Sequence, residues 1–529
     1  MEASIDTELP FDPSELFVAG QWRGAEHGAT LPLENPSEGS VLCAIARGSA
    51  ADVDAAVSAA QTALDGEWGR TSHAQRGRLL GAFSRKVLEQ IDVLARLEAL
   101  DVGKPLQQAR ADVMALARYL EFYGGAADKV HGQTLPFAQG YTALTLREPH
   151  GVTGHIVPWN YPMQIIGRSV GAALAMGNAC VLKPAEEACL TALAFARIAQ
   201  QVGLPTGAIN VVTGLGEEAG AALASHPGVQ HLSFTGSVAT GKLIQAAAAK
   251  NVVPVTLELG GKSPQIVFAD ADLDAAMPYL VNAGIQNAGQ TCSAASRILV
   301  ERQVFEQVRE RMAERYRALR VAPALADLDV GPLISQRQKG VVERYLALAR
   351  TGGPRIVAQG SLALDAPRGG HYVLPTLIDE VSPTHALAQE EVFGPVQVLI
   401  AFDGEAQALQ IANGTAYGLV AGVWTRDGAR QTLPAPRASV RGHAWPGTTR
   451  ARAGSSRRRA PARSSSRRSA SASSRSTRWP ARRRCSRPSW VKTPRRCAPS
   501  SSRRFRSAAF RRRRTWATPR VICAPTKPA

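Results

Sequence analysis

Residues 179–212 read ACVLKPAEEACLTALAFARIAQQVGLPTGAINVV, and this stretch decides the fold class. It opens with a short apolar run at 179–183 and closes with a second one at 209–212. Between them, apolar residues recur about every four positions, as on one face of a helix, and Gly203 and Pro205 mark the end of that helix. Strand–helix–strand units of this kind form right-handed crossovers between parallel strands. The stretch therefore predicts one unit of a parallel α/β sheet.

The same alternation of strands and helices continues in both directions. Downstream, a glycine turn at 214–216 leads into a helical pattern, and a strand pattern at 231–234 leads into another glycine turn and helix. Upstream, the alternation begins near Thr153. Further downstream, a second α/β unit begins at 265–268. Such patterns predict parallel sheets with helices on both faces, which bind ligands beyond the carboxyl ends of their strands. We expect an α/β fold with two such units.

The charge of the chain is divided unevenly. The 529 residues carry a net charge of +19, but residues 431–529 alone contain 26 Arg, 2 Lys and no Asp or Glu. Residues 1–430 therefore hold 34 basic and 43 acidic residues, the balance of an ordinary, mildly acidic globular protein. The basic total thus describes the C-terminal segment, and it does not make the rest of the chain a nucleic-acid-binding protein.

Cysteine usage and hydropathy indicate the compartment. Four cysteines are dispersed through residues 1–430 without paired short spacing, which argues against a disulfide framework or a zinc site and fits a reducing compartment. Residues 1–16 lack the apolar core of a signal peptide, and no run of about 18 apolar residues could span a bilayer. We expect a cytoplasmic protein with no bound metal and no membrane partner.

Two short segments, ELGGK at 258–262 and GQTC at 289–292, carry side chains suited to chemistry on a carbonyl group. A cysteine is more often a small buried hydrophobe than a nucleophile, but the polar residues around Cys292 favour exposure to a substrate. Glu258 follows an apolar strand pattern, where a glutamate is usually a surface charge. Next to paired glycines it could instead serve as the base that activates a water molecule.

A third segment, PWNYP at 158–162, supplies a side-chain amide. Asn160 between two prolines could be a simple turn residue, or it could donate to a developing oxyanion, an interaction whose removal costs about 2.7–4 kcal/mol of barrier lowering. In this order, Asn160, Glu258 and Cys292 resemble the catalytic motifs of the NAD(P)-dependent aldehyde dehydrogenase superfamily. The resemblance runs from about residue 16 to about residue 430.

The resemblance implies a function and a role for each of these residues. It implies NAD-dependent oxidation of a small-molecule aldehyde to a carboxylic acid through a thiohemiacetal and a thioester on Cys292. Asn160 and the backbone N–H of Cys292 would hold the oxyanion, and Glu258 would activate the hydrolytic water. Relatives that transfer the acyl group to coenzyme A generally lack a carboxylate at this position, so Glu258 favours the hydrolytic type.

The resemblance also assigns the residues that bind the cofactor. Lys183 and Glu186 would hold the adenosine ribose, although they could also be a solvated charge pair at a helix start. A carboxylate there accepts from a 2′-hydroxyl and repels a 2′-phosphate, which favours NAD over NADP. Gly236 and Ser237 would present N–H groups to the pyrophosphate at a helix start. By resemblance alone, the nicotinamide end would be bound by Glu391, Phe393 and Trp159.

These assignments imply a domain organisation. We expect a cofactor-binding domain from residues 1–128 and 148–260, a catalytic domain at 261–430, and a protruding β-hairpin at 129–147 that joins subunits of a homo-oligomer. After residue 430, the helix, the Pro-Phe-Gly-Gly turn and the final strand of the family are not recognisable. Assembly should therefore be impaired, because the hairpin lacks its partner strand.

Residues 431–529 have the composition of a disordered segment. They contain one Leu, one Ile, three Val and two Phe, too few apolar residues to bury a core. We hypothesise that a change of reading frame in a GC-rich gene produced this segment, since such frames yield Arg, Ala, Pro and Ser. The chain could then be an inactive or misfolded product. A further alternative is a nucleic-acid-binding tail, although its charge alone would bind nucleic acid non-specifically at low salt.

Overall fold

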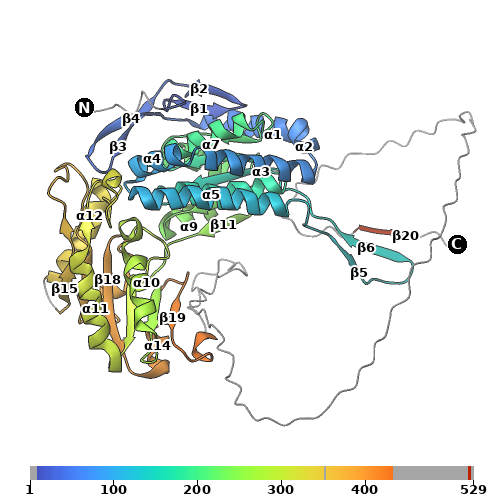
Figure 1. Cartoon of the computed structure of the whole chain (residues 1–529). Helices are drawn as coiled ribbons and strands as arrows, with labels where there is room; N and C mark the ends of the chain where they lie inside the picture. The colour runs from blue at the N-terminus through green and yellow to red at the C-terminus, as the bar shows by residue number, and fades with distance from the viewer. Residues whose placement is uncertain (1–8, 351–352, 433–521, 526–529) are drawn as a thin grey trace, which may run out of the picture. The chain divides into compact units, whose positions relative to one another are not determined.

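The computed structural model describes residues 9–350, 353–432 and 522–525. Two hydrophobic cores dominate the described residues, and each is built around one mixed β-sheet. Figure 1 shows that helices flank both sheets. The predicted α/β fold class is therefore confirmed. Among the described residues, no helix combines the length and the apolar character needed to cross a bilayer.

The first sheet has seven strands, of which five are parallel and two form an antiparallel hairpin at one edge. In spatial order the strands are β11 (Val255–Glu258), β10 (His231–Thr235), β7 (Val152–Val157), β8 (Ala179–Pro184), β9 (Ile209–Val211), β1 (Glu15–Val18) and β2 (Gln21–Gly24). The stretch at 179–212 folds as predicted, because β8 and β9 run parallel with Cys180 opposite Ile209 and are joined by a helix.

Helices of the first core begin at recognisable caps. Ser49 and Ser72 each accept a hydrogen bond from the backbone N–H three residues ahead, in complete capping boxes. The helices are α1 (Ala50–Asp65), α2 (Glu67–Arg70), α3 (His73–Glu89), α4 (Ile91–Val102), α5 (Leu106–Ala126), α6 (Pro162–Ala175), α7 (Leu190–Gln201), α8 (Ala221–Ser225) and α9 (Val238–Ala249). A short π-helix, η2 (Gly216–Gly220), precedes α8, and a separate hairpin joins β3 (Thr30–Asn35) to β4 (Ser40–Ala46).

The second sheet has six strands, five of them parallel. In spatial order they are β15 (Arg355–Gln359), β17 (Thr376–Asp379), β18 (Val396–Phe402), β13 (Arg297–Glu301), β12 (Pro264–Val267) and β19 (Gly422–Trp424). The accompanying helices are α10 (Leu273–Ile285), α11 (Phe305–Ala318), α12 (Gln336–Arg350), α13 (Ala386–Gln389) and α14 (Gly404–Asn413). A two-stranded pair of β14 (Arg320–Val321) and β16 (Ser361–Leu362) and short 3₁₀ turns complete the unit.

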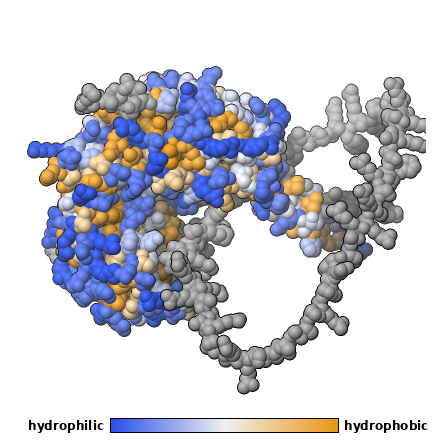
Figure 2. All heavy atoms as spheres, viewed as in Figure 1, coloured by the Kyte–Doolittle hydropathy of each residue, from blue (hydrophilic) through white to orange (hydrophobic). Residues whose placement is uncertain are grey.

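The predicted hairpin at 129–147 is present as β5 (Gln133–Leu135) and β6 (Tyr141–Thr145), which are antiparallel. Several large side chains of this hairpin are exposed, among them Phe137, Tyr141 and Leu144. Figure 2 shows hydrophobic residues on the surface of this part of the molecule. Exposed apolar surface on a protruding element is typical of a site that contacts another molecule.

The expectation that this hairpin lacks a partner strand is wrong. Strand β20 (Ile522–Pro525) lies antiparallel to β6, with Ile522 opposite Leu144 (Figure 1). A composition averaged over 99 residues does not reveal a short apolar run, whereas an open strand edge can pair with any extended segment. The rest of the segment for which we predicted disorder, residues 433–521 and 526–529, lies outside the described residues.

Candidate active site

A cavity of about 470 Å³ lies where segments of the two α/β units meet, within the usual range of small-molecule sites. Glu258 ends β11, Thr235 ends β10, and Asn160 lies in the loop after β7, so the carboxyl ends of three parallel strands border the cavity. Cys292 reaches the same cavity from the loop after α10. The structure thus brings together Asn160, Glu258 and Cys292, although Asn160 and Cys292 are more than a hundred positions apart in the sequence.

The loop that carries Cys292 has an unusual backbone. Asn287 and Ala288 have positive φ values of 50° and 53° in the short turn η3 (Gln286–Gly289). Gly289 also has a positive φ, and a Cβ there would lie 2.1 Å from the carbonyl oxygen of Gly394, so only glycine fits. Backbone strain of this kind persists where the surrounding structure holds it in place. Here it turns the chain so that Cys292 borders the cavity.

Cys292 differs from the other cysteines of residues 9–432. Cys43, Cys180 and Cys189 are buried, whereas Cys292 is partly exposed in the cavity. Burial nevertheless raises the pKa of the Cys292 thiol, and the positive charge of Arg168 opposes that shift. The thiol must therefore lose a proton before it can act as a nucleophile.

Both the side-chain amide and the backbone carbonyl of Asn160 make hydrogen bonds. Its side-chain Nδ2 donates to the carbonyl oxygen of Gln290 at 2.9 Å. Its own backbone carbonyl accepts from Lys104 Nζ and from Asn287 Nδ2, each at 2.9 Å. Because a side-chain amide carries two N–H donors, the bond to Gln290 leaves one donor for a substrate oxygen.

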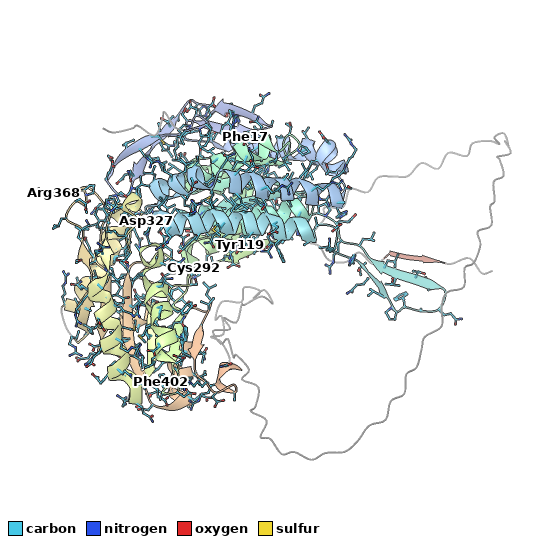
Figure 3. The ribbon with its side chains drawn as sticks, viewed as in Figure 1. Phe17, Tyr119, Cys292, Asp327, Arg368 and Phe402 are labelled. Atoms are coloured by element: carbon cyan, nitrogen blue, oxygen red, sulfur yellow. The ribbon has the colours of Figure 1, made fainter. Side chains whose placement is uncertain are left out.

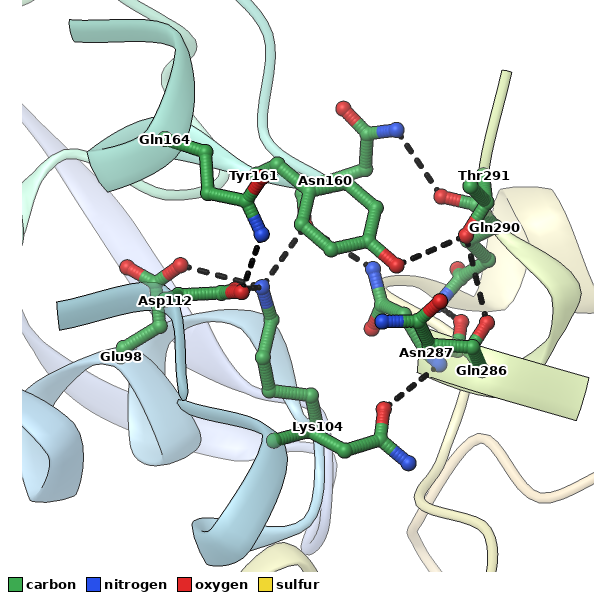
Figure 4. A network of polar contacts seen from close by, with 11 residues as sticks. Glu98, Lys104, Asp112, Asn160, Tyr161, Gln164, Gln286, Asn287, Gln290 and Thr291 are labelled. Atoms are coloured by element: carbon green, nitrogen blue, oxygen red, sulfur yellow. Dashed lines mark hydrogen bonds and ion pairs between the residues drawn. The ribbon is translucent and has the colours of Figure 1, made fainter. Parts of the chain in front are cut away.

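A buried network of polar groups, centred on Lys104, holds the backbone carbonyl of Asn160 (Figure 4). Lys104 Nζ donates to Glu98 at 3.0 Å and forms a second, short ion pair with Asp112. It also lies 4.3 Å from the centre of the Tyr161 ring. Burial disfavours the ammonium, but the two carboxylates outweigh it and raise the pKa of Lys104. Burial also raises the pKa of Glu98 to about 7, although Lys104 opposes this shift.

Glu258 lies within the cavity with 36% of its side chain exposed. Gly260 and Gly261, which follow it closely, lie against Glu391, a contact that the sequence did not reveal. A Cβ on Gly260 would lie 2.1 Å from Glu391 Oε2, and the Gly261 N–H donates to Glu391 Oε1 at 3.1 Å. The glycine pair thus makes room for Glu391, whose pKa burial raises to about 6.

The residues predicted to hold the cofactor lie in two groups. Lys183 and Glu186 lie at the carboxyl end of β8 and form an ion pair of 2.9 Å, but they are not part of the cavity lining. Burial favours the neutral form of Glu186, yet Lys183 outweighs it and lowers the pKa of Glu186. This carboxylate is therefore ionised at neutral pH and can accept a hydrogen bond.

The second group lines the cavity itself. Ser237 caps α9, accepting from the N–H of Thr240 at 3.1 Å, and Gly236 precedes it. Trp159 and Phe393 lie edge to face, with their ring centres 5.4 Å apart. Together with the pair at β8, these groups present a helix N-terminus, a carboxylate, an ammonium and aromatic rings. That donor set fits a dinucleotide laid across the strand ends.

Sequence analysis missed several residues of this site. Lys104 and Asp112 gave no signal, because a buried charged pair looks like two surface charges in a sequence. Tyr161 lines the cavity, as its place beside Asn160 suggests, and the residues on the same face of α6 could have been found as well. Gln164, Ile165 and Arg168 follow Pro162 at helical spacing and all line the cavity. Gln338 was also missed, and its Nε2 holds the backbone carbonyl of Phe393 at 2.9 Å.

Comparison with known proteins agrees with this geometry. The model of the aldehyde dehydrogenase family matches residues 22–442. The chain is 40% identical to a hydroxyisobutyraldehyde dehydrogenase of Mycolicibacterium austroafricanum over 428 residues, which is 81% of this chain and 84% of that protein. It is 38% identical to human retinal dehydrogenase 2 over 437 residues, which is 82% of this chain and 84% of that protein.

Solved structures are similar as well. A Burkholderia cenocepacia protein assigned to the aldehyde dehydrogenases is 60% identical, with a TM-score of 0.78 over 79% of this chain and 88% of that one. An NAD⁺ complex of an aldehyde dehydrogenase from Bacillus cereus is 36% identical, with a TM-score of 0.78 over 82% and 88% of the two chains. The chain therefore belongs to the aldehyde dehydrogenase family of oxidoreductases.

Proposed function

We propose that the chain oxidises an aldehyde to a carboxylic acid with NAD, using Cys292 as nucleophile. The observation that carries this proposal is the shared cavity of Cys292, Glu258 and Asn160. Overall, one aldehyde, one water molecule and one oxidised cofactor give one carboxylate, one reduced cofactor and two protons. NAD, when bound, supplies the two-electron acceptor for this oxidation.

Each protein group has one task in the proposed reaction. Cys292, once deprotonated, forms a bond from sulfur to the carbonyl carbon, and the carbonyl π electrons move to oxygen. The free N–H of Asn160 and the backbone N–H of Cys292 stabilise that oxyanion. After oxidation the acyl group remains on Cys292 as a thioester. Glu258 then removes a proton from a water molecule, whose oxygen attacks the thioester and releases the Cys292 thiolate.

The cofactor preference rests on Glu186. Its ionised carboxylate beside Lys183 suits a ribose with two hydroxyl groups and repels a 2′-phosphate, so we propose NAD in preference to NADP. Gly236 and Ser237 would hold the pyrophosphate, while Glu391, Phe393 and Trp159 would bind the nicotinamide end. We further propose residues 1–128 with 148–260 as the cofactor-binding domain and 261–430 as the catalytic domain.

The assembly and the state of this chain are separate proposals. We propose that the hairpin at 129–147 joins copies of the chain, supported by its exposed apolar side chains and its pairing with β20. The alternative of an inactive product is supported by an exposed aromatic side chain at the edge of the second sheet. Tyr279 is 65% exposed, and its ring packs beside Trp424 on β19, the last strand of that sheet among the described residues. The cytoplasmic location and the origin of residues 431–529 in another reading frame stay predictions.

The central test is Cys292→Ala in the full chain, assayed by NADH absorbance with several aldehydes. We expect the substitution to abolish turnover, and Cys43→Ala, a control at a buried cysteine of the first core, to retain it. Turnover by Cys292→Ala would refute the nucleophile assignment. A wild-type chain that melts cooperatively and shifts with NAD, yet oxidises no aldehyde, would favour the inactive product.

A further inference from the structure

One cation lines the cavity and takes part in none of the bond changes described above. Among the described residues that line the cavity, Arg168 is the only one with a positively charged side chain. It comes from α6, on the same face as Gln164 and Ile165, which line the cavity together with Tyr161 at the N-cap of this helix. Its side chain is 41% exposed.

The guanidinium of Arg168 has unused hydrogen-bond donors. Its nearest acidic partner, Glu258 Oε2, lies 4.0 Å from Nη2, beyond hydrogen-bond distance, and Arg168 makes no hydrogen bond within the described part of the chain. Arg297, buried in the second core, instead donates four hydrogen bonds to backbone carbonyls between 2.8 and 3.0 Å. A structural arginine normally donates its N–H groups to protein acceptors. The N–H groups of Arg168 make no such hydrogen bonds, which indicates that they bind a ligand.

The neighbours of Arg168 suit a small anionic group. Tyr119 on α5 also lines the cavity and adds a phenol (Figure 3). Gln164, one turn before Arg168, is held by Asp112 through its Nε2. A planar guanidinium with two parallel N–H donors matches a carboxylate in a bidentate pair.

The position of Arg168 also limits the length of the ligand. Tyr161, at the start of α6, contacts Thr291 through their hydroxyl groups at 2.8 Å, next to Cys292. Arg168 follows seven residues later, about 10 Å along the helix at 1.5 Å per residue. The Arg168 guanidinium lies 4.0 Å from Glu258, and its charge acts on the Cys292 thiol in the same cavity. A molecule that reaches both the sulfur and the guanidinium therefore has a short chain, with its reactive carbonyl at one end and its anion at the other.

We propose that Arg168 is the anion-binding residue of the substrate site and that this chain acts on short aldehydes bearing a carboxylate at the far end. This inference rests on the proposed oxidation and adds the substrate class to it. The product of such a substrate is a dicarboxylate. Because Arg168 touches the far end of the substrate, it governs selection and leaves the bond changes to Cys292 and Glu258.

The kinetic test compares the semialdehydes of succinic, glutaric and adipic acid with their methyl esters, which keep the aldehyde but lose the charge. We expect the ratio of kcat/KM, acid over ester, to fall by about 10- to 100-fold in Arg168→Met, the effect of losing a charge-assisted pair. Arg168→Lys should retain part of the ratio. Arg118→Met, which removes an exposed arginine next to Tyr119 in sequence, should leave the ratio at the wild-type value.

A second test needs neither turnover nor cofactor. Iodoacetate and iodoacetamide alkylate the same thiolate with loss of iodide, and only iodoacetate is an anion. Mass spectrometry of the Cys292 peptide gives the two rates, whose ratio cancels any change in the thiolate fraction. We expect Arg168→Met to lower the ratio of iodoacetate to iodoacetamide relative to the wild type and to Arg118→Met.

The outcomes separate the two proposals. An acid-to-ester ratio near one in the wild type, or an alkylation ratio that Arg168→Met does not change, overturns the assignment of Arg168 even if neutral aldehydes are oxidised. Loss of all aldehyde oxidation with an alkylation preference that depends on Arg168 overturns the proposed reaction and keeps the anion site.

Discussion

Replacing Lys104 by Met tests how the buried network supports the active site. The side chains of Lys104 and Glu98 are fully buried and that of Asp112 is 2% exposed, so the substitution leaves two carboxylates without their cation. Removing one partner of a buried ion pair typically costs 3–5 kcal/mol, because the remaining charge stays desolvated. Glu98 escapes part of this cost, since its pKa is already raised to about 7 and it can bind a proton. We therefore expect about 3 kcal/mol, mostly from Asp112.

Thermal melting measures this loss. About 3 kcal/mol lowers Tm by roughly 6–12 °C in a domain of 150–250 residues. The matched control is the double variant Lys104→Met with Asp112→Asn, which removes both charges and should recover much of the Tm. Asn160 also loses one of the two hydrogen bonds to its carbonyl, so kcat/KM should fall in the single variant even below its melting range.

Two results would contradict this account of the network. A Tm change that corresponds to less than about 1 kcal/mol would mean that the ion pairs of Lys104 contribute no more to stability than exposed ion pairs do. A double variant that melts lower than the single variant would show that Asp112 is stable without its cation. Either result would mean that the position of Asn160 depends on Asn287 and Gln290 alone.

Three further predictions concern the site and its pH dependence. Asn160→Ala should lower kcat by about 10²–10³-fold below its melting range, and an unchanged kcat would remove Asn160 from the oxyanion site. Glu186→Gln should raise the kcat/KM ratio of NADP over NAD, measured with one aldehyde, and a ratio equal to that of the wild type would contradict its role. Burial lowers the pKa of Lys262 to about 7, so the unfolded chain binds the extra proton and stability should rise with pH from about 7 to about 10.4. Lys262→Met should flatten that rise in melting curves recorded across the range, and a variant that keeps the wild-type slope would refute it.

Periodic patterns in the sequence predicted the sheets well. The strand at 179–183, the helix after it and the strand at 209–212 were all found, because parallel strands buried on both faces read as apolar runs and helices repeat every 3.6 residues. The hairpin at 129–147 was also found. Strand β20 was missed, since four residues barely change the composition of the long basic segment on which the prediction rested.

Part of the site was visible for the same local reason. Asn160, Glu258 and Cys292 stand out because each lies in a short motif of glycines, prolines and polar residues, and the structure places all three on one cavity. Their catalytic roles remain proposals that the variants above will test. Arg168 was not singled out, although its helical spacing from Tyr161 was available in the sequence.

The sequence by itself determined the order of strands and helices, the family resemblance and the chemical types available for catalysis, because these depend on neighbouring residues. Only the tertiary structure decided which charges are buried together, which donors are left unused and which residues share a cavity. Lys104 meets Asp112 and Asn160, and Arg168 faces the cavity with an open guanidinium, through contacts between elements far apart in the chain. Burial changes the free energy of a charge by several kcal/mol, and no local pattern records burial.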